Sequence, residues 1–252
     1  MIATFHDLAG ASVFITGGGN GIGAALTDGF LAQGAKVAFV GRSDATAFVD
    51  EMEAKHGNRP LFLQCDITDT TALQAAIATA ADQHGPLKAL VNNAANDARH
   101  DASQITPQQW DDLQAVNLKA YFFACQKAAE VMRPQGAIIN FTSISYMFGA
   151  PDMIAYTTAN AGIMGMTRSL AREWGKRGIR FNAIAPGWVF TEKQENLWAT
   201  PESKAAFLAR QCLPQPIMPD DMVGPVLFLA SQASAMMTGQ TMVVDAGVVG
   251  TG

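Results

Sequence analysis

The chain has 252 residues, of which 49% are hydrophobic and 15% charged, and its formal net charge is -5. A chain of this size and apolar content buries a sizeable core, so we expect a single domain. Its acidic balance gives no general attraction to phosphate backbones, which argues against nucleic acid as a partner.

Targeting, membrane and redox signals point to the cytoplasm. Met1 to Gly10 contains neither a basic segment nor a continuous apolar run, and no later apolar run approaches the length that crosses a bilayer. We therefore expect a soluble, cytoplasmic protein with no membrane partner. The cysteines are too few and too widely spaced for a disulfide framework or a metal site, which favours buried free thiols at Cys65, Cys125 and Cys212. The histidines show no ligand spacing, so no metal is expected.

Short β-branched runs alternate with longer Ala-rich amphipathic segments along the chain. The predicted strands are Ser12–Thr16, Lys36–Val40, Leu61–Cys65, Ala89–Val91, Ala137–Phe141, Arg180–Ile184 and Met242–Val244. The predicted helices are roughly Gly21–Gln33, Asp44–His56, Thr70–His84, Pro107–Met132, Met153–Arg177 and Asp220–Ser231. The strands are apolar throughout, as strands covered on both faces are. The pattern predicts an α/β fold, with a doubly wound parallel sheet of about seven strands and helices on both faces.

Two local features stand out within this alternation. Thr106-Pro107-Gln108-Gln109 has the residues of an N-cap, a first-turn proline and a capping-box glutamine, so the fourth helix is expected to begin there. Residues 186–216 are dense in aromatic and polar side chains without periodicity, and we expect a substrate loop or lid in this stretch.

A glycine-rich turn, Thr16-Gly17-Gly18-Gly19-Asn20-Gly21-Ile22-Gly23, follows the first strand and opens the first helix. Backbone amides and the positive end of the helix dipole can approach a pyrophosphate there. A flexible loop without a ligand is the alternative, but the position between strand and helix favours a nucleotide.

The end of the second strand bears on the choice of nucleotide. Gly41-Arg42-Ser43 stands where an acidic residue would hold an adenosine ribose. A guanidinium and a hydroxyl suit the 2′-phosphate of NADP, which we favour over NAD, and a solvated arginine is the alternative.

Tyr156 and Asn160 are four residues apart and share one face of a predicted helix. A phenol on such a face can act on a substrate atom, although a core tyrosine with a satisfied hydroxyl fits the spacing equally well. Asn160 supplies hydrogen-bonding groups but no charge.

Together these motifs resemble those of the short-chain dehydrogenase/reductase family over nearly the whole chain, which implies a Rossmann-type fold. The glycine turn has that family's form, and Asn92-Asn93-Ala94-Ala95 is similar to its NNAG element. By this resemblance the catalytic positions are Asn117, Ser143, Tyr156 and Asn160. The implied cofactor-binding positions are Gly17, Asn20, Gly21, Ile22, Gly23, Arg42, Ser43, Asp66, Ile67, Asn93, Ala94, Tyr156, Asn160, Pro186, Gly187, Val189 and Thr191.

Each of these matches also has a purely structural interpretation. Asp66 could cap the following helix, Asn92-Asn93 could satisfy loop backbone, and Asn117 could bridge a helix kink. Ser145 lies two residues after Ser143 and points elsewhere in an extended chain, and the family alignment favours Ser143.

The resemblance implies reversible hydride transfer between a nicotinamide and a secondary alcohol or hemiacetal. Tyr156 would be general base in oxidation and general acid in reduction, with Ser143 bonded to the same oxygen. The family has a lysine at the position of Asn160, which binds the ribose hydroxyls and lowers the tyrosine pKa. An ammonium about 6.5 Å from the phenol stabilises the phenolate by about 2.5 kcal/mol at an effective dielectric near 20. We therefore expect either an impaired oxidoreductase or another proton route, for which Lys119 should face the wrong way.

The stretch Asn92–His100 is similar to that of sugar dehydrogenases such as aldose 1-dehydrogenases, as are Thr191–Gln194 and Gln211–Leu213. This resemblance implies an aldose or sugar-acid substrate, with candidate contacts at Asn96, Arg99, His100, Ser145, Trp188 and Gln194. A salt-bridge cluster of Asp97, Arg99 and His100 is an equal alternative. A hydroxy-ketone substrate also remains open. As an alternative, Met147, Phe148, Met153 and Trp188 could form a more apolar pocket.

A rival class is a nucleotide-binding sensor or assembly subunit without catalysis. Asn160 favours it, whereas the joint presence of Asn117, Ser143 and Tyr156 favours an enzyme. The family also implies a homotetramer formed through the fourth and fifth long helices and the segment Gln240–Gly252.

Overall fold

The apolar segments pair into one parallel seven-stranded sheet with the order β3-β2-β1-β4-β5-β6-β7. The computed structural model describes residues 3–250. The strands are β1 Ser12–Thr16, β2 Lys36–Gly41, β3 Leu61–Gln64, β4 Leu87–Asn92, β5 Met132–Phe141, β6 Arg180–Pro186 and β7 Thr241–Val244. The chain begins at the centre, winds outward to β3, and then crosses to β4 on the other side of β1. The predicted doubly wound fold is confirmed, and its strand order reverses between β1 and β4.

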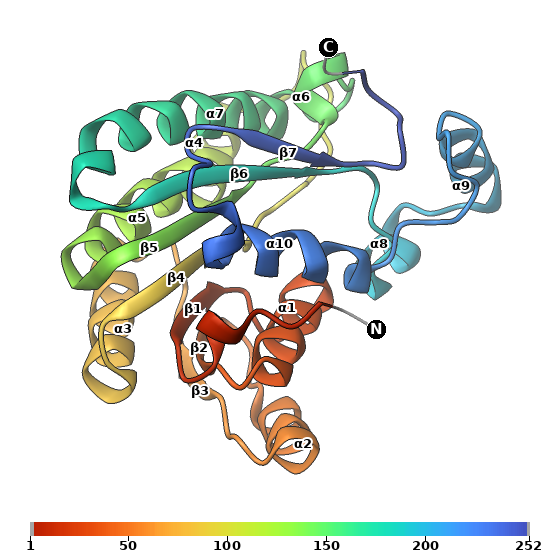
Figure 1. Ribbon diagram of the computed structural model, residues 1–252. Coiled ribbons are helices and arrows are strands. Elements are labelled where there is room, and N and C mark those ends of the chain that lie inside the picture. The colour runs from red at the N-terminus through yellow and green to blue at the C-terminus, as the bar shows by residue number, and fades with distance from the viewer. Residues whose placement is uncertain (1–2, 251–252) are drawn as a thin grey trace.

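Helices cover both faces of the sheet (Figure 1). One face packs against α1 Gly21–Ala32, α2 Thr46–His56 and α10 Val223–Ala230, and the other against α3 Thr70–His84, α5 Ala120–Val131 and α7 Ile154–Trp174. Alternate residues of β1 belong to opposite cores: Val13 and Ile15 pack with α1, whereas Phe14 packs with α3. This period of two explains why the strand is apolar along its whole length.

The long helix predicted over Pro107–Met132 is interrupted. It consists of α4 Pro107–Gln114, a π-helical segment η2 Ala115–Lys119 and α5. The predicted capping box at its start is confirmed, because Thr106 Oγ1 accepts from Gln109 N at 3.2 Å and Gln109 Oε1 accepts from Thr106 N at 2.9 Å. The hydrophobic periodicity of the sequence does not reveal the π-helical segment. Asn117 in this segment instead contacts the backbone of Asn96 in the loop after β4.

Strands β4 and β5 begin earlier than predicted, at Leu87 and Met132. A lysine inside β4 hid its start: Lys88 is 2% exposed, and its Nζ lies 3.3 Å from Asp7 Oδ2 and 3.0 Å from Gln135 O. The charge is buried because it has partners at the amino-terminal edge of the sheet.

The stretch predicted as an irregular lid contains two short helices, α8 Glu192–Leu197 and α9 Pro201–Leu208, and α9 stands away from the body of the sheet (Figure 1). Each begins at a threonine N-cap whose hydroxyl accepts a backbone amide, which gives these non-periodic segments helical starts. The remaining short elements are η1 His6–Leu8, α6 Ser145–Phe148, η3 Gly175–Arg177, η4 Pro219–Met222 and η5 Gln232–Ser234.

Cys65 and Cys125 are buried free thiols, as predicted, but Cys212 is exposed. It lies after α9, where its Sγ contacts Gly247 O at 3.4 Å at the surface. Across residues 3–250 no helix is long and apolar enough to span a membrane. The same residues contain no group of three or more His, Cys, Asp or Glu side chains placed to hold a metal ion.

Candidate active site

A cavity of about 1220 Å³ opens at the carboxyl ends of the central strands, where the strand order reverses. Such crevices are where open α/β sheets bind ligands, and this one exceeds the 300–1,000 Å³ typical of small-molecule sites. All the predicted site residues line it except Gly23 and His100. The sequence motifs, which are spread over most of the chain, therefore converge on one cavity large enough for a dinucleotide and a second molecule.

The glycine turn is shaped for close approach. Gly17 and Gly21 have φ of +70° and +50°, in the left-handed region that favours glycine. Gly23 lies behind the turn rather than on the cavity wall, and a Cβ there would lie 1.9 Å from Gly17 O, so it allows α1 to pack on the turn. Asn20 makes no side-chain cap to α1. The first amides of the helix are thus left to an anion such as a diphosphate.

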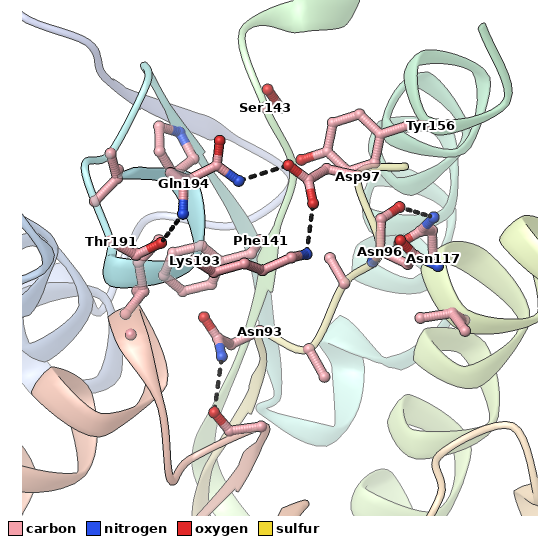
Figure 2. A pocket seen from close by; sticks show the side chains of 18 of the residues that line it. Asn93, Asn96, Asp97, Asn117, Phe141, Ser143, Tyr156, Thr191, Lys193 and Gln194 are labelled. Carbon is pink, nitrogen blue, oxygen red and sulfur yellow. Dashed lines mark hydrogen bonds and ion pairs between the residues drawn. The ribbon is translucent and has the colours of Figure 1, made fainter. Parts of the chain in front are cut away.

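Side chains from neighbouring strands hold this turn in place. Asn93 Nδ2 donates to Thr16 O at 3.1 Å and to Gly17 O at 3.3 Å (Figure 2). Thr16 Oγ1 accepts from the backbone amides of Asn93 and Ala94 at 2.9 and 3.1 Å. Asn92 instead points into the core, where its amide donates to Asn140 Oδ1 at 2.9 Å. The two adjacent asparagines thus have different partners, as alternation along an extended chain requires.

Arg42, Ser43 and Asp66 line the end of the cavity beside β2 and β3. Among residues 3–250 the Arg42 guanidinium has no hydrogen-bond or ion-pair partner, so it is available to a ligand phosphate. Asp66 Oδ1 accepts from Thr68 N and Thr68 Oγ1, and these bonds, aided by Arg42, lower the pKa of its carboxyl. Asp66 is not the cap of α3. Asp69 has that role and accepts from Ala72 N at 2.9 Å.

Tyr156, Ser143 and Asn160 meet on the wall between β5 and α7. Burial, together with the negative charge of Asp97, raises the pKa of Tyr156 to about 12, although hydrogen bonding by Ser143 and Asn160 opposes the shift. Asn160 is 3% exposed, and its Nδ2 donates to the backbone Tyr156 O at 2.8 Å. Its side-chain donor therefore binds its own helix. Lys119 is exposed and does not line the cavity, as expected.

Asn117 binds the loop that follows β4. Its Oδ1 accepts from Asn96 N at 2.8 Å, and its Nδ2 donates to Asn96 O at 2.9 Å (Figure 2). Because the π segment η2 carries Asn117, the interruption of the helix and the path of the loop are set together. The structural role considered as an alternative for Asn117 is thus found in part, because Asn117 lies in a π-helical interruption of the helix and also lines the cavity.

Asp97 is the main wall residue that sequence reasoning left outside the site. Its Oδ1 accepts from Lys193 Nζ at 2.7 Å and its Oδ2 from Gln194 Nε2 at 2.6 Å (Figure 2). Gln194 in turn accepts from Trp188 Nε1 at 2.9 Å. These contacts join the loop after β4 to α8 across the cavity. Nearly a hundred residues separate Asp97 from Lys193, so no local pattern in the sequence reveals the pair.

Within this chain Asp97, Arg99 and His100 do not form the salt-bridge cluster that was the alternative to substrate contact, because each residue has a different partner. The Arg99 guanidinium lies over the Trp198 ring, 4.7 Å from its centroid. His100 Nε2 accepts from Ala155 N at 3.3 Å at the start of α7, which places His100 behind the cavity wall.

Two buried polar atoms on the cavity wall have no hydrogen-bond partner within residues 3–250: Ser145 Oγ and Trp198 Nε1. Ser145 N donates to Ser143 Oγ at 3.1 Å. The Ser143 hydroxyl therefore has a partner within the chain, whereas the Ser145 hydroxyl has none among the described residues. A buried polar atom without a partner is costly, and a polar ligand removes that cost.

Comparisons with known proteins agree with this geometry. A family model described as enoyl-(acyl carrier protein) reductase matches residues 17–249. A probable galactose dehydrogenase from Rhizobium meliloti is 46% identical and a D-xylose 1-dehydrogenase from Caulobacter vibrioides 43% identical, each over 97% of this chain and at least 97% of its own length. A crystal structure of a short chain dehydrogenase from Burkholderia cenocepacia in complex with NADP is 31% identical with a TM-score of 0.89, covering 96% of this chain and 98% of that one.

Proposed function

Because the chain belongs to the short-chain dehydrogenase/reductase family, as an NAD(P)-dependent dehydrogenase, we propose that it transfers hydride to or from a sugar or sugar acid. The observation that carries this proposal is nearly full-length identity of 46% to a probable galactose dehydrogenase and of 43% to a D-xylose 1-dehydrogenase. The Ser145 hydroxyl and the Trp198 indole N–H, which have no partner among residues 3–250, support it, because a polyhydroxylated substrate would satisfy both. Of the candidate contacts, Asn96, Arg99, Ser145, Trp188 and Gln194 line the cavity.

NADP is the proposed cofactor in preference to NAD. Arg42 and Ser43 stand at the end of the cavity where a 2′-phosphate would lie, and the Arg42 guanidinium is free to fork onto it. The glycine turn would hold the diphosphate, Asp66 and Ile67 the adenine, and the segment from Pro186 to Thr191 the nicotinamide amide. Bound there, the nicotinamide ring would supply a carbon that accepts or returns hydride.

Proton transfer is assigned to Tyr156. Its phenol would take the proton of the substrate hydroxyl in oxidation and return it in reduction, while Ser143 orients the same oxygen. Asn117 would act through the Asn96 backbone by fixing the loop that carries Asp97.

Asn160 limits this chemistry in the proposed enzyme. A neutral amide that already donates to Tyr156 O gives the phenolate no positive charge. The pKa of Tyr156, raised to about 12, leaves little phenolate near neutral pH. We infer slow oxidation near neutral pH or a proton route that does not need the phenolate.

The same observation supports a second candidate, a protein that binds the dinucleotide as a sensor or assembly subunit without turnover. Initial rates with NADP and NAD, over a panel of aldoses and sugar acids at pH 6 to 10.5, separate the two. Turnover of an aldose supports the dehydrogenase. Tight NADP binding by fluorescence with no turnover at any pH supports the binding protein.

A homotetramer is proposed through α4 and α5, α7 and the carboxyl-terminal segment from Gln240, of which Thr251 and Gly252 lie outside the described residues. Phe122 on α5 is 38% exposed, an apolar surface that a helix of a second copy would cover. Light scattering on the purified chain tests this: a mass four times the 26.7 kDa of the chain is expected, and a monomer would contradict it.

A further inference from the structure

Asp97 is bonded to the lid helix α8 and lies beside the phenol assigned to proton transfer (Figure 2). Figure 2 shows the carboxylate between Tyr156 and the two α8 side chains that hold it. Asp97 is close enough to the Tyr156 phenol for its charge to contribute to the raised pKa of that group. A substrate oxygen held by the phenol would therefore lie on the same part of the cavity wall as this carboxylate (Figure 2).

The carboxylate is anchored but not saturated. Lys193 and Gln194 use one lone pair on each oxygen, and an ionised carboxylate offers about four acceptor sites. The side chain is 20% exposed, so it is largely shielded from bulk water while it still faces the cavity. The bonds from Lys193 and Gln194 lower the pKa of Asp97 against the effect of burial, so the group stays ionised in the neutral range.

We propose that Asp97 is a specificity-determining residue that accepts a hydrogen bond from the hydroxyl on the carbon next to the reacting carbon. The inference rests on the proposed function and narrows its substrate class to compounds with adjacent oxygens. Lys193 and Gln194 fix the orientation of the carboxylate. A substrate without the neighbouring hydroxyl displaces water from Asp97 and gives no donor in return, so it is rejected.

The test is a cycle of two substrates and two proteins. D-galactose and 2-deoxy-D-galactose are titrated into the NADP-loaded chain and into Asp97→Ala, with binding read from tryptophan fluorescence, because Trp188 and Trp198 line the cavity. The unmodified chain is expected to bind galactose roughly 10- to 100-fold more tightly than its deoxy form, as for a hydrogen bond to a charged group. In Asp97→Ala the two affinities should agree within about threefold. Where turnover is measurable, kcat/KM should show the same loss of discrimination.

Two further variants separate recognition from fastening of the lid. Lys193→Met removes one lid contact but keeps the carboxylate, and should retain discrimination above about tenfold because Gln194 still holds Asp97. Asp101→Asn changes an exposed carboxylate of the same loop outside the cavity and should leave both affinities unchanged. Equal losses for both sugars in Asp97→Ala, with discrimination intact, would overturn the proposal and leave Asp97 as a lid contact only. No binding of any aldose by the loaded chain would instead overturn the sugar assignment, and this inference with it.

Discussion

The side-chain amide of Asn160 donates to the backbone carbonyl of Tyr156 at 2.8 Å, one helical turn earlier. The Asn160 amide is thus directed to the backbone of its own helix, and Asp97, whose charge acts on the Tyr156 phenol, is negative. Burial of Tyr156 and the charge of Asp97 together therefore favour the protonated phenol.

The first prediction concerns Asn160→Lys. An ammonium about 6.5 Å from the phenol should lower the pKa of Tyr156 by about 2 units at an effective dielectric near 20. Oxidation near neutral pH should then rise up to about 100-fold if phenolate limits the rate. Initial rates from pH 6 to 10.5 measure the change. Asn160→Leu is the uncharged control, and an equal gain in both variants would show that charge is not the cause.

The second prediction is the pH dependence of the chain itself. A pKa raised from the ordinary 10 to about 12 means that phenolate grows tenfold per pH unit throughout the range in which the protein is assayed. The oxidation rate should therefore climb with a logarithmic slope near one from pH 7 to 10 without a plateau. Reduction, which uses the protonated phenol, should stay level over the same range. Tyr156→Phe should abolish both reactions. A plateau of the oxidation rate below pH 9 would contradict the raised pKa of Tyr156.

The third prediction tests the choice of cofactor. Arg42→Ala should weaken NADP binding roughly 10- to 100-fold, because a charge-assisted bond to phosphate is lost, and should change NAD binding by less than about threefold. Calorimetric titration with both dinucleotides measures this directly. Arg59→Ala, which removes an arginine outside the cavity, is the matched control. Equal losses for NADP and NAD in Arg42→Ala would mean that the arginine does not read the 2′-phosphate.

The sequence predicted the fold and the glycine turn of the cavity well because both depend on local patterns. Apolar runs, the capping box at Thr106 and the glycine turn are each set by neighbours within a few residues. The side of the cavity formed by α8 and the loop after β4 could not be predicted, because it depends on contacts between residues far apart in the sequence. Asp97 meets Lys193 and Gln194 across the cavity, and Asn117 meets the Asn96 backbone from a π-helical turn. Burial of Lys88 likewise required Asp7, which lies far away in sequence.

That buried lysine gives the last prediction, on stability. Lys88 is 2% exposed and pairs with the one-third exposed Asp7, and burial lowers the pKa of the ammonium. Asp7→Asn keeps an acceptor for Gln232 N but leaves the buried charge unpaired, which should cost about 1–2 kcal/mol of unfolding free energy. Lys88→Met removes the charge and fills the same space, so it should cost less than about 1.5 kcal/mol. In the Lys88→Met background Asp7→Asn should then cost clearly less, because the Lys88 ammonium is gone and only the weaker effect of Asp7 on the buried Arg180 guanidinium remains. Urea unfolding at pH 7 of the four chains gives these values, and a larger loss in Lys88→Met than in Asp7→Asn would show that the ammonium itself stabilises the sheet edge through Gln135.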